Sequence, residues 1–160
     1  MRYSGQNGIN VTITDEVLTT FASYRQTSQN KKEAGGQLFA TFDNGDAIIR
    51  EATVPSLDDK RGRFFFLPNR WKERKEIQNR HSQGLHYVGD WHTHPENNPL
   101  PSQQDLRSIS NCFEMSTHQL NFFFMIIVGK SDFPAGLHVS INTGEYHQVL
   151  STIIAEQIET

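Results

Sequence analysis

The residues best suited to chemistry lie in the stretch HTHPENNPLPSQQD, which runs from His92 to Asp105. In an extended strand, side chains two positions apart project to the same face, so His92 and His94 can reach one ion. Asp105 can supply a third ligand, because the prolines before it disfavour helix and a new helix can begin at Ser102. Two imidazoles and one carboxylate form a common catalytic zinc set, with water in the fourth tetrahedral position. The stretch therefore predicts an open site for one zinc ion.

Ser102 and Asp105 also have a purely structural explanation. The pattern Ser-x-x-Asp resembles a capping box, in which the serine hydroxyl accepts from a first-turn amide and the acidic side chain reaches back. Taken alone, this pattern favours the cap, and the nearby histidine pair shifts the balance towards a metal site. A structural zinc would be closed by a fourth protein ligand. The single cysteine, Cys112, sits too far along the next helix to be an obvious one.

Hydrolysis of an amide at a zinc ion also requires a general base. Zinc lowers the pKa of its bound water to about 7, but a base must take the proton and an acid must protonate the departing amine. Glu33 in KKEAGGQLFA can do both. Gly35 and Gly36 lack the side-chain bulk that would keep the glutamate and a substrate backbone away from the metal. The alternative is that Glu33 is an exposed charge at the start of a strand.

Hydrophobic periodicity and turn signals predict the elements that position these residues. The predicted helices cover 15–30 with Thr14 as cap, 71–83 with Asn69 as cap, and a segment that starts after Ser102. The predicted strands cover 35–42 and 45–54, which form a hairpin, and 63–68, 85–94, 119–129 and 136–142. The segment 145–159 is expected to be a short strand followed by a helix. This order indicates an α/β domain with a mixed, largely buried sheet.

Length and charge narrow the possible functions. The chain has 160 residues and a formal net charge of −3. This length fits one domain over 1–160, and the charge gives no electrostatic case for nucleic acid or an anionic membrane. No apolar run is long enough to span a membrane, and the N-terminus lacks the pattern of a secretory signal, so we expect a cytoplasmic protein.

Several other residues are expected to have structural roles. Cys112 is expected to be a small core residue on an apolar helix face. The polar segment 56–63 is expected to be an irregular surface loop that can touch a protein substrate, and 63–68 a strand buried on both faces. Core positions rather than an aromatic platform are expected for Phe64, Phe65, Phe66, Phe122, Phe123 and Phe124. Surface or hydrogen-bonded structural positions are expected for His81, His86, His118, His138 and His147.

Glu33 in E-x-G-G, followed by H-T-H-P and a short loop to S-x-x-D, resembles the JAMM signature of the JAB/MPN metallopeptidases. The resemblance implies a single MPN/JAB-type domain, a mixed β-sheet flanked by helices with a layer architecture like that of cytidine deaminases. It implies that His92, His94 and Asp105 bind zinc, that Glu33 activates water, and that Ser102 helps to hold the oxyanion of the tetrahedral intermediate. A zinc deaminase would instead show H-x-E and a downstream P-C-x-x-C, which the chain lacks.

The stretch HYVGDWHTHPENNPLPSQQDL is similar to bacterial JAB proteins of the cyclic-oligonucleotide anti-phage systems called CBASS. In these systems an E1/E2-like ligase joins the C-terminus of a cGAS/DncV-like nucleotidyltransferase (CD-NTase) to target proteins, and the JAB protein reverses the linkage. The resemblance thus implies an isopeptidase or endopeptidase that binds an extended C-terminal tail. Two alternatives stay open: a JAB peptidase that processes a ubiquitin-like or sulfur-carrier tail, and an MPN scaffold without activity. The substrate-binding residues are not predicted.

Overall fold

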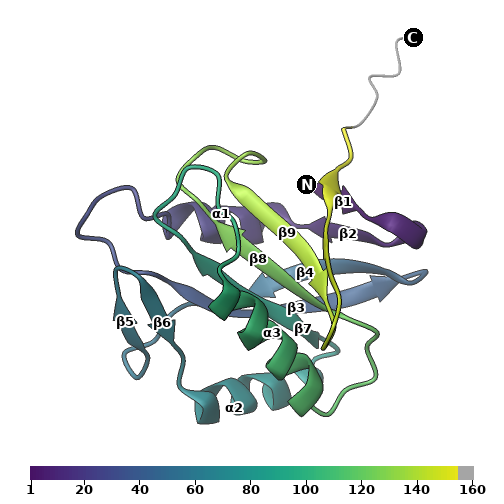
Figure 1. The fold of residues 1–160 in the computed structure, drawn as a ribbon. Coiled ribbons are helices and arrows are strands. Elements are labelled where there is room, and N and C mark those ends of the chain that lie inside the picture. The colour runs from purple at the N-terminus through teal and green to yellow at the C-terminus, as the bar shows by residue number, and fades with distance from the viewer. Residues whose placement is uncertain (155–160) are drawn as a thin grey trace.

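The computed structural model describes residues 1–154, in which three α-helices lie on a large mixed sheet (Figure 1). The helices are α1 (Asp15–Ser23), α2 (Arg70–His81) and α3 (Gln103–Met115), with a short 3-10 helix at Gln6–Gly8. The first strands are β1 (Arg2–Ser4), β2 (Asn10–Ile13), β3 (Gly35–Asp43), β4 (Asp46–Ala52), β5 (Lys60–Gly62) and β6 (Phe65–Leu67). The remaining strands are β7 (His86–Thr93), β8 (Phe123–Val128), β9 (Leu137–Asn142), β10 (His147–Val149) and β11 (Ser151–Thr152).

Nine of these strands form one sheet in the order β10-β9-β8-β7-β3-β4-β2-β1-β11. The pairs β2–β4 and β7–β8 are parallel and the other pairs are antiparallel, as expected for a mixed sheet. The two outermost strands, β10 and β11, are separated in sequence only by Leu150. The sheet therefore curls until a single terminal segment hydrogen-bonds to both of its edges, which leaves few unpaired edge groups.

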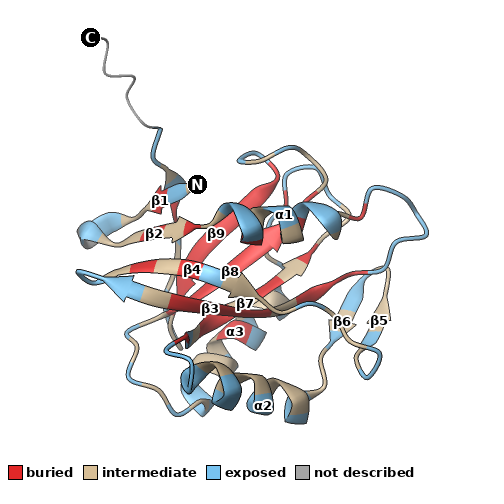
Figure 2. Cartoon of the chain, turned by 180° about the vertical axis from the view of Figure 1, so that it is seen from behind, coloured by how far each residue is buried: buried red, intermediate tan, exposed pale blue. Residues whose placement is uncertain are grey.

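The sheet is covered on both faces, as α/β proteins with buried strands require. Figure 1 shows α2 and α3 on one face, and Figure 2 shows α1 on the other. Alternation along β8 sends Phe124 and Ile126 towards the larger core on the α1 side, and Phe123 and Met125 towards the smaller core under α3. Trp91, which is 1% exposed, fills the centre of the larger core. Its indole Nε1 donates to the carbonyl oxygen of Thr53 at 2.8 Å.

The predicted helix 15–30 is too long, because α1 ends at Ser23. Gln26 explains the early end. Its buried side chain donates to the backbone oxygens of Lys31 and Arg63 and accepts from the hydroxyl of Thr93. These bonds hold the chain after α1 in an irregular path that no helical pattern in the sequence could reveal. Thr14 is the N-cap residue, although its side chain makes no capping hydrogen bond.

The strand predicted in 63–68 is present as β6, but the expectation that it is buried on both faces is wrong. The short β6 pairs only with β5 in a separate two-stranded hairpin. A strand with one partner and no layer above it leaves its side chains in solvent, so Phe64 is 74% exposed and Phe65 48% exposed. The expectation of core positions is therefore wrong for these two, whereas Phe123 and Phe124 are buried. The expected irregular loop 56–63 is also partly wrong, because it contains β5.

The predicted strand in 145–159 is confirmed at β10, but the helix expected next does not begin there. Ser151 and Thr152 instead pair with β1 as β11, because the edge of β1 offers free backbone groups. The rest of that predicted helix lies outside the described residues. Among the helices of residues 1–154, none is long and apolar enough to cross a membrane.

Candidate metal centre

The histidine pair lies at the C-terminal end of β7, between its neighbours β3 and β8. His92 aligns with Gly35 of β3 and with Ile127 of β8, so it faces the layer that contains α3. The backbone N–H of His94 continues the pairing by donating to the carbonyl oxygen of Val128 at 3.0 Å. Thr93 points the other way, is fully buried and donates its hydroxyl to Gln26. The expected alternation is confirmed.

Asp105 brings a carboxylate to these two imidazoles from the first turn of α3. His92 Nε2 lies 3.2 Å from Asp105 Oδ1, His94 Nε2 lies 3.2 Å from Asp105 Oδ2, and the two Nε2 atoms are 3.1 Å apart. The three side chains are the one group of His, Cys, Asp and Glu ligands in residues 1–154 close enough to share a metal ion. Each imidazole therefore faces a different oxygen of the same carboxylate, and we call the cluster of these three side chains the triangle.

This triangle fits a tetrahedral zinc ion. Ligand atoms bound at about 2.0–2.2 Å to such an ion are separated from one another by roughly 3.3–3.5 Å. The two imidazole Nε2 atoms are slightly closer, at 3.1 Å, and each lies 3.2 Å from one oxygen of the Asp105 carboxylate. No fourth His, Cys, Asp or Glu joins this group among residues 1–154, which leaves a position for water, as the sequence predicts for an open site.

The capping box predicted for Ser102 and Asp105 is present. The hydroxyl of Ser102 accepts from the backbone N–H of Asp105 at 3.1 Å, and Asp105 Oδ2 accepts from the backbone N–H of Ser102 at 2.7 Å. The cap fixes the carboxylate rather than competing with the site, because Oδ2 can face both the helix amide and His94. The hydroxyl of Ser102 acts only as an acceptor in the cap, so its hydrogen is free to be donated.

Glu33 lies next to the triangle and is 8% exposed, so the alternative of an exposed charge is wrong. Its backbone is held by β5: its N–H donates to the oxygen of Gly62 at 2.7 Å, and Arg61 Nε donates to its oxygen at 2.8 Å. Burial raises the pKa of Glu33. The nearby His92 and His94 partly offset this rise, whereas Asp105 adds to it. A raised pKa moves a carboxylate towards the range in which a general base is most effective.

Within the triangle, the carboxylate and the imidazoles stabilise one another's charged forms. Burial alone would raise the pKa of Asp105, but hydrogen bonds from His92 and His94 dominate and hold the pKa well below its usual range. Burial alone would lower the pKa of His94, but its contact with Asp105 outweighs this and raises the pKa. The carboxylate is therefore ionised under all ordinary conditions, as a metal ligand must be.

Glu96 and His138 were not connected with the triangle in the sequence analysis. Glu96 Oε1 lies 3.6 Å from His94 Nδ1, a buried nitrogen that has no hydrogen-bond partner within residues 1–154. A carboxylate in this place can orient a ligating imidazole, and its position directly after H-x-H-P was an available signal. His138 aligns with Ile127, which in turn aligns with His92. Only the strand register brings it near.

His138 is also the exception among the five other histidines. It is 6% exposed and its Nε2 lacks a partner among the described residues, so a surface or hydrogen-bonded position is the wrong expectation. Burial, helped by His147, lowers the pKa of His138 to about 4. His118 and His147 are hydrogen-bonded, as expected. His81 and His86 are exposed.

Gly35 and Gly36 are required for a reason other than the expected one. A Cβ on Gly35 would lie 2.7 Å from the Phe66 ring, and a Cβ on Gly36 would lie 2.1 Å from the oxygen of Thr53. The space that their missing side chains leave is therefore filled by the chain itself. By allowing β6 to pack directly on the start of β3, Gly35 places the β5–β6 hairpin beside Glu33.

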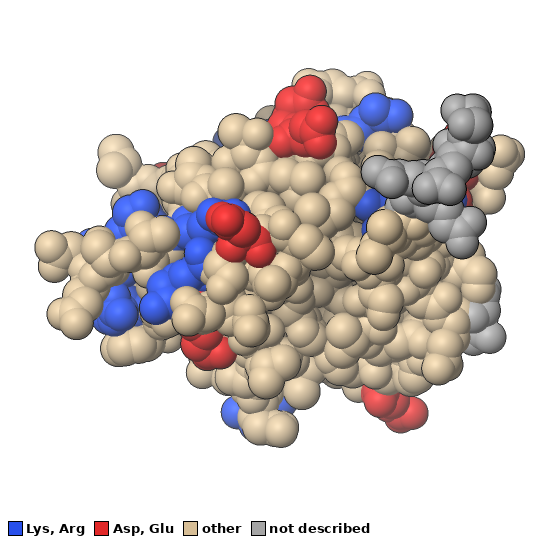
Figure 3. Space-filling model, turned by 90° about the horizontal axis from the view of Figure 1, so that it is seen from above, with Lys and Arg blue, Asp and Glu red and all other residues tan. Residues whose placement is uncertain are grey.

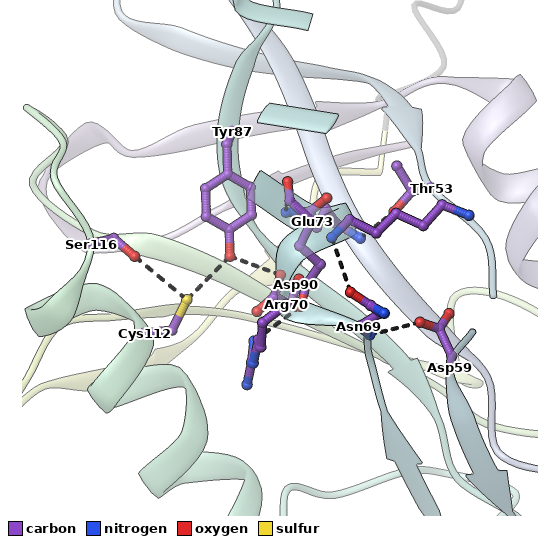
Figure 4. A network of polar contacts seen from close by, with 11 residues as sticks. Thr53, Asp59, Asn69, Arg70, Glu73, Tyr87, Asp90, Cys112 and Ser116 are labelled. Atoms are coloured by element: carbon purple, nitrogen blue, oxygen red, sulfur yellow. Dashed lines mark hydrogen bonds and ion pairs between the residues drawn. The ribbon is translucent and has the colours of Figure 1, made fainter. Parts of the chain in front are cut away.

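A second polar network lies between α2, β7 and α3 (Figure 4). The hydroxyl of Tyr87 donates to Asp90 Oδ1 at 2.8 Å and lies 3.2 Å from Cys112 Sγ. Arg70 donates to Glu73 at 3.1 Å. Cys112 is only partly buried, which modifies the expectation of a core residue. Burial raises the pKa of its thiol to about 11, so it is not a reactive thiolate.

The buried Glu73 in this network should make the free energy of unfolding decrease as the pH rises. Burial, with Asp90 adding to it, raises the pKa of Glu73 from 4.5 to about 7. The folded chain therefore holds a proton that the unfolded chain releases, and ionisation of Glu73 costs stability as the pH rises from 4.5 towards 7. Urea unfolding should show Glu73→Gln to be more stable than wild type by about 1–3 kcal/mol near pH 8, with the difference shrinking near pH 5.

The exposed Glu145, which lies outside the helices, offers the matched control for this prediction. Glu145→Gln makes the same chemical change on a solvent-exposed side chain, so its stability should follow that of wild type at both pH values. A Glu73→Gln variant that is less stable than wild type near pH 8 would show that the Arg70 contact outweighs the cost of burial.

Comparison with known proteins gives a consistent result. Residues 16–140 match the model of a family described as prokaryotic homologs of the JAB domain. A Pseudomonas aeruginosa protein named CD-NTase/cGAS isopeptidase is 36% identical over 71% of this chain and 73% of its own length. An Escherichia coli protein of the same name is 31% identical over 76% of this chain and 78% of its own length.

A solved structure supports the fold alone. The solution structure of a Desulfitobacterium hafniense protein superposes with a TM-score of 0.62 at 18% identity. The alignment covers 93% of this chain and 95% of that one. At this low sequence identity, the match shows that the two proteins share a fold, and it gives no information about activity or substrate.

Proposed function

Since the chain belongs to the family of prokaryotic homologs of the JAB domain, we propose that it is a zinc-dependent isopeptidase of a CBASS anti-phage system. It would cleave the bond after the C-terminus of a conjugated CD-NTase and so reverse the work of an E1/E2-like ligase in the cytoplasm. The observation that carries the chemistry is the triangle of His92, His94 and Asp105 with Glu33 beside it. The names of the relatives support the choice of substrate.

The three donors would hold one zinc ion, because their types and separations suit it. When bound, zinc would lower the pKa of a water molecule to near neutrality and polarise the scissile carbonyl. The chain's part is to keep the site rigid. β7 fixes both imidazoles, and the capping box fixes the carboxylate before any substrate arrives.

Glu33 would act as the general base and then as the general acid. Its buried carboxylate can accept a proton from the attacking water and return it to the departing amine. Anchoring of the Glu33 backbone by Arg61 and Gly62 limits its motion.

Ser102 would donate a hydrogen bond to the oxyanion of the tetrahedral intermediate. Its hydroxyl accepts from the Asp105 amide, which orients the oxygen and leaves the hydrogen for the substrate. The residue thus caps α3 and contacts the reacting carbonyl. The two explanations that the sequence leaves open for Ser102 are compatible.

A pair of substitutions separates these two roles of Ser102. Ser102→Ala should lower kcat by about 100- to 1000-fold, as loss of an oxyanion donor does, and should lower the stability by about 1 kcal/mol through loss of the cap. Ser102→Gly should cost only a few tenths of a kcal/mol, because glycine is tolerated at N-caps, yet should lose as much kcat. Recovery of kcat in the glycine variant would exclude the oxyanion role. Steady-state kinetics and thermal unfolding supply both readouts.

The substrate is tested with two fusions. One joins a reporter protein to the C-terminus of a CD-NTase, and the other joins it to a ubiquitin-like protein. We expect release of the reporter from the CD-NTase fusion and inhibition by a chelator. Release from the ubiquitin-like fusion only would overturn the anti-phage assignment and keep the chemistry. No release from either fusion would favour the alternative of a scaffold without activity.

A further inference from the structure

Positive charge is concentrated beside the predicted base Glu33. We call this region the basic surface and define it as Lys31, Lys32, Lys60, Arg61 and Arg63. The three lysines are exposed and the two arginines are half-buried. Figure 3 shows Lys and Arg gathered at one end of the molecule. The whole chain has a net charge of −3, so this concentration is local.

Hydrogen bonds join the two segments of the basic surface to each other and to Glu33. Gln26 Nε2 donates to the oxygens of Arg63 and Lys31, at 2.8 and 3.3 Å. Arg61 Nε donates to the oxygen of Glu33 at 2.8 Å. The basic surface and the catalytic glutamate therefore belong to one rigid unit, and a partner on this surface is held next to the triangle of metal ligands.

The protein balances the charge of the basic surface only in part. In the part of the chain that the structure describes, the ion pairs involve none of its five cations. The neighbouring carboxylates are Glu33, Asp58 and Asp59, so five cations stand beside three anions. Asp59 also accepts from the backbone N–H groups of Ser56 and Asn69, and of these three carboxylates only Asp58 is exposed. The remaining positive charge favours a partner that brings negative charge.

Apolar side chains border the basic surface on the β5–β6 hairpin. Phe64, Phe65 and Leu67 are 74%, 48% and 53% exposed. Exposed apolar side chains gathered on one hairpin are typical of surfaces that bind other molecules, because such a patch is unfavourable in water. The occupant must offer apolar groups as well as acidic ones.

We propose that the basic surface and the exposed Phe64, Phe65 and Leu67 bind an acidic segment with apolar side chains on the conjugated protein. The inference rests on the proposed function, since a site for amide hydrolysis takes a polypeptide and this surface borders it. Complementary charge speeds the encounter and fixes the orientation of the partner. The surface thus selects which conjugate is presented to Glu33.

Binding can be measured without cleavage in the Glu33→Gln variant of the full chain. The probes are two fluorescein-labelled unstructured peptides of equal length and apolar content, one rich in Glu and the other with Gln in place of each Glu. Fluorescence anisotropy should show the acidic peptide to bind about tenfold more tightly at low salt, with the preference fading as salt is added. Equal affinity for both peptides would overturn the proposal.

Charge reversal locates the surface. Lys31→Glu/Lys60→Glu should weaken binding of the acidic peptide by about tenfold or more. The control, Arg2→Glu/Arg50→Glu, reverses two exposed cations elsewhere and should leave binding within about twofold. Equal losses in the two double variants would show a general charge effect and contradict the proposal. Arg61 and Arg63 are left intact, because their guanidinium groups hold the backbone.

A labelled single-stranded oligonucleotide distinguishes the other class of anionic partner. If the oligonucleotide binds more tightly than the acidic peptide, and if its binding is lost on charge reversal of Lys31 and Lys60, the surface binds nucleic acid and the proposal is wrong. The two proposals also fail separately. A chain that cleaves neither fusion counts against the proposed function, whereas the peptide preference is read from binding alone.

Discussion

Replacing Glu33 with Gln should lower kcat for cleavage of the CD-NTase fusion by about 100- to 10,000-fold, the usual contribution of a general acid–base group. The change keeps the shape of a side chain that is 8% exposed, so the fold should persist. Glu33 is not one of the three clustered ligands, and zinc content should stay at one ion per chain. Reporter release and metal analysis on the same sample measure both.

Glu51→Gln is the matched control for this substitution. Glu51 is a half-buried carboxylate on β4 that pairs with Arg80. Its conversion to the amide should leave kcat within about twofold, since surface ion pairs contribute little and none of its contacts reach the reaction. If Glu33→Gln lost its zinc, Glu33 would be a ligand and the assignment of its role would be wrong.

Asp105→Asn should abolish metal binding while preserving the helix cap. The amide oxygen can still accept from the backbone N–H of Ser102, and the amide of residue 105 can still donate to the serine hydroxyl. A neutral amide is a far poorer zinc ligand than a carboxylate. Because loss of an outer-shell partner alone costs 10- to 100-fold in affinity, zinc affinity should fall by at least about 100-fold. Activity should fall with it.

The fully exposed Asp132 supplies the control for Asp105. Asp132→Asn makes the same chemical change at a carboxylate that is not one of the clustered ligands and should keep zinc and activity. Metal analysis and far-UV circular dichroism distinguish loss of zinc from loss of α3. Full zinc content in Asp105→Asn would mean that this carboxylate only caps the helix, which is the structural explanation its sequence first allows.

The site was largely predictable because its parts are local. The alternation of a strand sets His92 and His94 on one face, and a helix cap sets Ser102 against Asp105. Glu33 is the exception, since it is distant in sequence: the need for a base and the glycines after it suggested the residue, and the resemblance to the JAMM signature strengthened its link to the histidines. The structure adds the reason: β3 pairs with β7, and Gly35 aligns with His92.

The incorrect predictions share a physical cause. The three phenylalanines at 64–66 have the composition of a buried strand, but burial depends on which strands lie alongside, and β6 has only β5. The helix predicted to 30 ends at Ser23, because Gln26 bonds to residues far along the chain. His138 approaches the triangle only through the register of β8 and β9. Each outcome depends on tertiary contacts that local patterns do not encode.

The most direct test of the account is metal analysis of the purified wild-type chain beside its Glu33→Gln and Asp105→Asn variants. The account predicts one zinc ion per chain in the wild type and in Glu33→Gln, and none in Asp105→Asn. A wild-type chain that binds no zinc, even after incubation with the ion, would contradict it, because the triangle of His92, His94 and Asp105 would then have no role in hydrolysis.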